Sequence, residues 1–77
     1  KSVVVGSSVG LHARPAAIIS EAAGALDAEV TINGVDASSA LLLMTLGAAC
    51  GDTVEVASDD EAAVEAIAAL VEKDLDA

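Results

Sequence analysis

The chain of 77 residues contains no phenylalanine, tyrosine or tryptophan, although hydrophobic residues make up 55% of it. Aromatic rings normally supply a large part of the buried area in a core. Its core must therefore be built from valine, isoleucine, leucine, alanine and the single methionine, Met44. A chain of this length without a linker or an internal repeat predicts one domain over residues 1–77.

Positive charge is also scarce, because 3 basic residues stand against 13 acidic ones and the net charge is −10. Nucleic-acid binding and attraction to an anionic membrane both need lysine and arginine, so we expect neither. The simplest interpretation of the acidic excess is a solubilising surface. A cytoplasm of high salt content and a partner with a basic docking face are the alternatives.

Cys50 is the only cysteine, which excludes a disulfide within the chain and fits a reducing cytoplasm. The sequence contains no cluster of cysteine and histidine, so we expect no metal and no cofactor. No apolar run approaches the roughly 18 residues of a membrane span, and residues 1–20 do not resemble a signal peptide. These absences predict a cytoplasmic protein without membrane insertion.

Apolar periodicity predicts an α+β fold with the order βαββαβα. Asn33-Gly34 indicates a tight hairpin, Ser38 or Ser39 can cap a short helix, and Ser58 with Glu61 fits a capping box. This order implies an antiparallel four-stranded sheet with three helices on one face. The expected strands cover residues 3–5, 29–32, 35–37 and 53–57, and the expected helices cover residues 15–23, about 39–46 and about 61–75.

The strongest local signal is the segment Gly10–Ala17, which holds the only histidine, the only arginine and the only proline of the chain. Pro15 suits the first position of a helix, so it predicts a helix start. His12 and Arg14 would then lie at a helix N-terminus, where free backbone N–H groups and the helix dipole favour anions. A nucleophilic imidazole beside a permanent cation suits the transient binding of a phosphoryl group.

This segment, Gly-Leu-His-Ala-Arg-Pro-Ala-Ala, resembles the active centre of the HPr family, the histidine-containing phosphocarriers of the bacterial sugar phosphotransferase system. The resemblance implies an open-faced βαββαβα sandwich. It also implies that His12 accepts a phosphoryl group on Nδ1 from enzyme I, which took it from phosphoenolpyruvate, and passes it to sugar-specific enzyme IIA. By the same resemblance, Arg14 stabilises the phosphoryl group. Such a protein is a carrier and a substrate of other enzymes, rather than an enzyme itself.

A second segment similar to the family spans Ala37–Gly47. By resemblance, Ser39 aligns with a serine that HPr kinase phosphorylates in many low-GC Gram-positive bacteria, although a helix N-cap explains it equally well. The apolar residues Leu41 and Met44 are the expected contacts for enzyme I and enzyme IIA. The C-terminal sequence resembles members from high-GC Gram-positive bacteria, in which that kinase can be absent.

Other functions remain open from the sequence. A regulatory HPr paralogue would bind a protein partner, such as a transcriptional regulator, and use phosphorylation as a switch. An HPr domain excised from a larger fused protein is a third interpretation. The capped final helix instead favours a free-standing chain, and we expect a monomer. A small hydrolase such as an acylphosphatase is the most distant alternative, because Arg14 is the only arginine.

Overall fold

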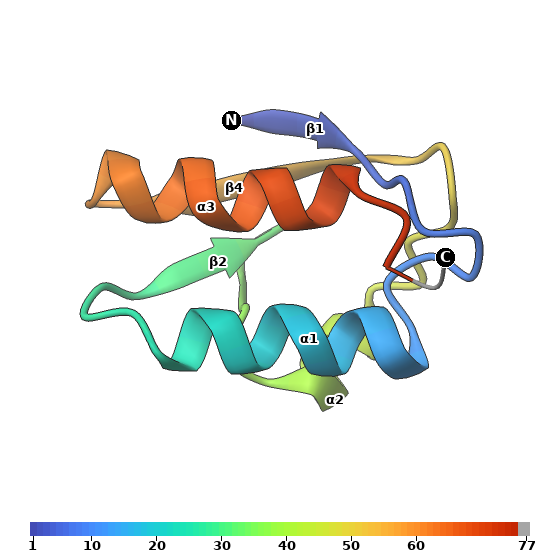
Figure 1. The fold of residues 1–77 in the computed structure, drawn as a ribbon, viewed down its shortest axis with the longest axis horizontal. Helices are drawn as coiled ribbons and strands as arrows, with labels where there is room; N and C mark the ends of the chain where they lie inside the picture. The colour runs from blue at the N-terminus through green and yellow to red at the C-terminus, as the bar shows by residue number, and fades with distance from the viewer. Residues whose placement is uncertain (76–77) are drawn as a thin grey trace.

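A computed structural model describes residues 1–75 of the chain (Figure 1). The order of its elements is the expected βαββαβα. The elements are β1 (Ser2–Val4), α1 (Ala13–Gly24), β2 (Val30–Ile32), β3 (Val35–Asp36), α2 (Ala40–Thr45), β4 (Thr53–Ser58) and α3 (Glu61–Glu72).

The four strands form one antiparallel sheet in the order β1-β4-β2-β3. Val3 lies opposite Val54, and Ile32 lies opposite Val56. Helices α1 and α3 lie side by side on one face of the sheet, and α2 packs against α1 (Figure 1). The predicted open-faced sandwich is therefore confirmed.

The hairpin between β2 and β3 turns at the predicted dipeptide. Asn33 has a φ of 50° and Gly34 a φ of 83°. A type I′ turn needs positive φ at both central residues, and its twist matches that of the paired strands. The two residues therefore determine the register in which Ile32 pairs with Val35.

Helix α3 ends at Glu72 rather than at about residue 75, and two helix starts differ from the prediction in position or in capping. Helix α1 begins at Ala13 rather than Pro15, so proline is the third helical residue. This position is permitted because N–H groups in the first turn have no partner within the helix, and the missing N–H of proline costs nothing there.

The second difference concerns α3, which does not use the predicted capping box. Ser58 ends β4, where it pairs with Val30, and its Oγ accepts a hydrogen bond from the Asp60 N–H at 3.2 Å. Asp60 is the N-cap instead, and its carboxylate accepts from the Ala62 N–H at 3.0 Å. Because Ser58 pairs with Val30 in the sheet, it does not serve as the N-cap of α3.

The core lies between the sheet and the helices and consists of short aliphatic side chains. Met44 packs against it but is only partly buried. No helix within residues 1–75 has the length and apolar character needed to cross a membrane. The larger members that are almost fully buried are Val5, Leu11, Ile19, Ile32, Leu43, Val54, Val56, Ile67 and Val71.

Candidate functional site

His12 occupies the N-cap position of α1, with extended backbone at φ −138° and ψ 158°. Its side chain is exposed and forms no capping hydrogen bond. Arg14, in the first turn of the same helix, is exposed as well. The structure thus brings the two predicted residues together at the positive end of the helix dipole, with the imidazole open to solvent.

Ala13, between these two residues, has a φ of 46°. A residue with a Cβ rarely adopts this left-handed conformation, and doing so costs about 1–3 kcal/mol. Strain of this kind persists only where the surroundings fix the backbone. The peptide between His12 and Arg14 is therefore held by its neighbours.

Contacts with the segment after α2 provide part of this restraint. The Leu11 N–H donates to the Ala48 carbonyl at 3.0 Å, and the Leu11 side chain is buried. Gly10 has a φ of 74°, and a Cβ at this position would overlap the Ala48 carbonyl oxygen. The C-terminal end of α2 is thereby fixed beside the loop that carries His12.

Helix α2 places the remaining predicted residues. Ser39 is its N-cap, and its Oγ accepts from the Leu42 N–H at 3.3 Å. Leu41 is 70% exposed, whereas Met44 packs partly into the core. Of the two predicted contact residues, Leu41 is thus the more accessible.

Two more exposed apolar side chains lie on α2 and in the histidine loop. Leu42 is 40% exposed on α2, and Val9 is 52% exposed in the loop before His12. Three leucines in a row at residues 41–43 indicate that part of the run faces solvent, but not which part. Val9 lies in a loop without periodicity, so no signal in the sequence marked it.

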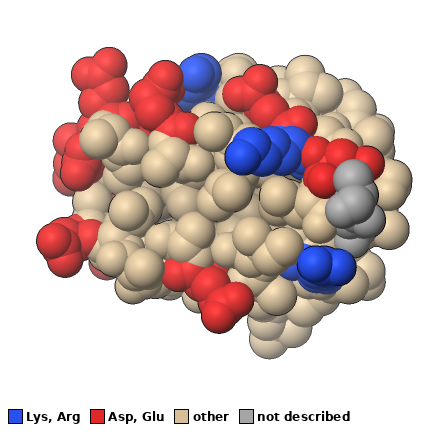
Figure 2. Space-filling view, in the orientation of Figure 1, with Lys and Arg blue, Asp and Glu red and all other residues tan. Residues whose placement is uncertain are grey.

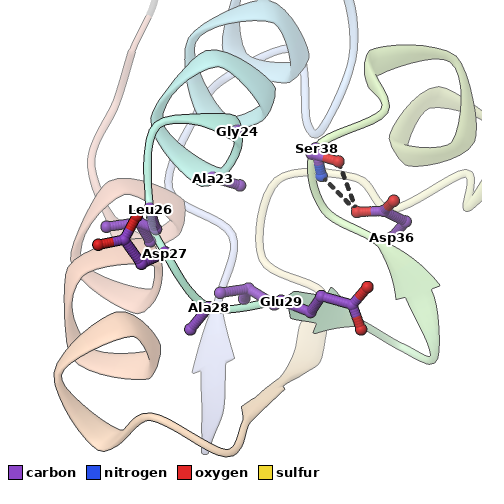
Figure 3. Close-up of a pocket in the computed structure, with 9 residues that line it drawn as sticks. Ala23, Gly24, Leu26, Asp27, Ala28, Glu29, Asp36 and Ser38 are labelled. Atoms are coloured by element: carbon purple, nitrogen blue, oxygen red, sulfur yellow. Dashed lines mark hydrogen bonds between the residues drawn. The ribbon is translucent and has the colours of Figure 1, made fainter.

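A hollow of about 210 Å³ lies at the opposite end of α1 (Figure 3). It is lined by Ala23 and Gly24 at the helix end and by Asp36 and Ser38. Because α1 has 12 residues, it separates this hollow from His12 by roughly 18 Å. The hollow is smaller than the roughly 300–1,000 Å³ of typical ligand pockets and is remote from the histidine.

One side of this hollow shows how the turn before α2 is fixed. The Ser38 hydroxyl and N–H both donate to Asp36 Oδ1, at 2.7 and 2.9 Å (Figure 3). The hydroxyl, followed by the N–H, lowers the pKa of Asp36 below its ordinary value of 3.8. This carboxylate therefore stays ionised and holds the residue that precedes the Ser39 cap.

Charge is distributed unevenly over the surface. Figure 2 shows acidic side chains gathered over the end of the molecule that carries the turn between β4 and α3. That turn consists of Asp59 and Asp60, and Glu61 begins α3. Within residues 1–75, no group of three or more histidine, cysteine, aspartate or glutamate side chains could hold a metal ion. At His12 the chain itself offers an imidazole, the guanidinium of Arg14 and backbone N–H groups of the first helical turn.

A family model described as "PTS HPr component phosphorylation site" matches residues 1–73. The chain belongs to the HPr family. A phosphocarrier protein HPr of Streptomyces coelicolor is 43% identical, with the match covering 99% of this chain and 90% of the relative. A phosphocarrier protein HPr of Vibrio cholerae is 40% identical, covering 92% of this chain and 88% of the relative.

The solved structures agree with this assignment to the HPr family. The crystal structure of a phosphocarrier protein HPr from Bacillus anthracis superposes with a TM-score of 0.82 at 36% identity, covering 92% of this chain and 93% of that one. The HPr-family chain is therefore a phosphocarrier of the phosphotransferase system. The expected similarity to high-GC Gram-positive members is matched by the Streptomyces relative.

Proposed function

We propose that His12 is the residue that carries the phosphoryl group, received from phosphorylated enzyme I and passed to sugar-specific enzyme IIA. Arg14 stabilises the group while it is bound. The protein acts as a single monomeric domain in the cytoplasm, where the exposed thiol of Cys50 stays reduced. It needs neither a metal nor a cofactor for this role.

The observation that carries the proposal is the exposed imidazole of His12 at the N-cap of α1, without a capping hydrogen bond. An N-cap side chain normally accepts from a backbone N–H of the first turn. Here the N–H groups of that turn, of which Pro15 has none, are left to an incoming anion, and the ring nitrogens are free to react. Arg14 supplies a permanent positive charge in the same turn.

The reaction conserves its groups at each transfer. A lone pair on Nδ1 attacks phosphorus, the bond from phosphorus to the donor atom of enzyme I breaks, and its electron pair returns to that atom. The same steps run from His12 to enzyme IIA. A carrier must also release the group, so the site must stabilise the transition state more than the bound phosphate. An exposed guanidinium and a few backbone donors provide such limited stabilisation.

We assign partner docking to the exposed apolar side chains around the histidine loop. Leu41 and Leu42 are exposed on α2, whose C-terminal end is tied to that loop through Ala48. Val9 is exposed within the loop itself. Surfaces that join partners transiently often have such an apolar centre with a polar rim. Met44 contributes less because it is partly buried.

Ser39 remains the candidate for regulation by HPr kinase. Its hydroxyl serves as the N-cap of α2, and the residue is only partly exposed. A phosphate at a helix N-terminus is electrostatically favourable, so modification is compatible with the cap. Because the hydroxyl already has a structural role, the presence of a serine here is explained without the kinase.

The deciding experiment incubates the protein with phosphoenolpyruvate and purified enzyme I and measures the intact mass. We expect the gain of one phosphoryl group, lost on acid treatment, in the wild type and no gain in His12→Ala. An acid-stable phosphate, or one that persists in His12→Ala, contradicts the assignment of His12. Failure of transfer from several enzyme I proteins supports the alternative of a regulatory paralogue.

The role of Arg14 is tested in the same assay with Arg14→Ala and Arg14→Lys. A hydrogen bond to a charged group contributes roughly 1.5–3 kcal/mol, so Arg14→Ala should slow transfer by about tenfold to a hundredfold. Arg14→Lys keeps the charge but loses the planar fork, and an intermediate rate is expected. Equal rates for all three proteins would exclude a role for the guanidinium in transfer.

A further inference from the structure

Ser7 is the one polar residue in the buried set of residues 1–75, with 1% of its surface exposed. Its Oγ donates to the Lys73 carbonyl at 3.0 Å and accepts from the Leu75 N–H at 3.0 Å. A buried hydroxyl that both donates and accepts has its hydrogen-bonding capacity well used. Ser7 therefore joins the loop between β1 and α1 to the segment that follows α3.

The neighbouring residue reinforces this junction. The Gly6 N–H donates to the Val71 carbonyl at 3.0 Å. A Cβ on Gly6 would overlap the Glu72 carbonyl oxygen, so the two backbones are in direct contact. The last carbonyl groups of a helix lack partners within the helix. At the end of α3 the loop provides donors for two such carbonyl groups: the Gly6 N–H bonds the Val71 carbonyl, and the Ser7 hydroxyl bonds the carbonyl of the C-cap Lys73.

Further hydrogen bonds fix the five residues that lead from Ser7 to His12. The Ser7 carbonyl accepts from the Gly10 N–H at 2.9 Å, and the Leu11 N–H donates to the Ala48 carbonyl at 3.0 Å. His12 follows directly. The loop is thus fixed by α3 at one end and by the segment after α2 at the other. Of these fixed points, Ser7 is the one made by a side chain that a small substitution can remove.

We propose that Ser7 is a positioning residue for phosphoryl transfer, which rests on the function proposed above. It does not touch the reacting atoms. Its hydroxyl holds the loop against the end of α3 so that the imidazole of His12 approaches phosphorus along one defined direction. Misplacement of a reacting group by about 1 Å can cost about a hundredfold in rate, so a loosened loop should slow transfer.

The test compares Ser7→Ala with Ser8→Ala, a matched change at the next, exposed residue. Rapid-quench kinetics with phosphorylated enzyme I give kcat and KM for transfer. We expect Ser7→Ala to lower kcat by about tenfold with a much smaller change in KM, because Leu41 and Leu42 on α2 still dock and only Val9 lies in the loosened loop. Ser8→Ala should behave as the wild type. Amide exchange at Gly10 should be faster in Ser7→Ala only.

A second pair of variants removes the other partner of the same hydrogen bond. Leu75→Pro removes the N–H that donates to Ser7 Oγ. Leu75→Ala keeps this N–H and controls for the loss of the leucine side chain. We expect Leu75→Pro, but not Leu75→Ala, to reproduce part of the lowered kcat, because the hydrogen bond from Ser7 to the Lys73 carbonyl remains. The double variant Ser7→Ala/Leu75→Pro should be no slower than Ser7→Ala alone, since Ser7→Ala already removes the hydrogen bond that Leu75→Pro breaks.

The outcomes separate this proposal from the function on which it rests. If the wild type is not phosphorylated, the proposed function fails. If the wild type is phosphorylated and Ser7→Ala has the same kcat, the positioning role of Ser7 is overturned. A lowered unfolding temperature with an unchanged kcat well below that temperature also overturns it, because the hydroxyl would then only stabilise the fold.

Discussion

Gly10 is the position in the histidine loop where a side chain would be tolerated least. Its φ of 74° lies in the left-handed region, and a Cβ would overlap the Ala48 carbonyl oxygen. We expect Gly10→Ala to lower the free energy of unfolding by about 2 kcal/mol or more. The backbone contributes about 1 kcal/mol of this, and displacement of a packed neighbour about 1–3 kcal/mol. Urea unfolding at equilibrium measures the change.

Gly34 is the matched control for this prediction. It has a φ of 83°, but a Cβ there would meet nothing within 4 Å. Gly34→Ala should therefore show only the backbone cost of about 1 kcal/mol. Equal losses for the two variants would mean that the loop and Ala48 separate easily, and that the fixed position inferred for His12 is wrong.

Among single residues, those with distinctive chemistry were predictable and those that act through backbone geometry were not. His12 and Arg14 could be placed at a helix N-terminus because Pro15 marks the start of the helix to within two residues. The left-handed φ of Ala13 had no signal, because alanine is common in ordinary helices. Contacts with other segments impose that conformation.

At the scale of elements, α2 depends strongly on its cap because it has only 6 residues. Helices this short are not stable on their own in water. Ser39→Ala leaves the Leu42 N–H without its partner and should lower the free energy of unfolding by about 1 kcal/mol. Ser39→Asp keeps an acceptor at the helix N-terminus and should match the wild type in thermal and urea unfolding. Equal losses in both variants would contradict a capping role.

Helices and strands could be predicted from the sequence where one face of the element is buried. The alternation in β4 appears directly in the structure, with Val54 and Val56 buried between exposed neighbours. Helix starts were less predictable because several residues compete for each cap. Ser58 fits a capping box in sequence but is held by its pairing in β4, and Asp60 takes its place. The capping preference of Ser58 is thus overridden by its pairing with Val30 in the sheet.

At the scale of the whole molecule, contacts between distant segments were beyond sequence patterns. Ser7 and Leu75 are 68 positions apart, and no periodicity relates them. The scarcity of cations, by contrast, was plain in the composition and has a structural counterpart. Lys1 forms ion pairs with Glu55 and Glu65, and both pairs are exposed at the surface. Attractive pairs are therefore few compared with the acidic groups.

This imbalance predicts how stability responds to salt. The radius of gyration is 10.5 Å, close to the screening length of about 10 Å at 0.1 M salt. Below that concentration, acidic groups across the whole molecule repel one another, and 13 acidic residues face 3 basic ones. Sodium chloride should therefore raise the unfolding temperature by a few degrees up to about 1 M, where the screening length is about 3 Å.

The size and the specificity of this effect can both be checked by calorimetry. A gain of about 1 kcal/mol corresponds to about 4–8 °C for a domain of this size. Potassium chloride should give the same curve as sodium chloride, because screening depends on ionic strength. Sulfate should stabilise further, since it is also excluded from protein surfaces. An unfolding temperature that falls with either chloride would mean that the exposed ion pairs of Lys1 outweigh the repulsion, contrary to the excess of negative charge.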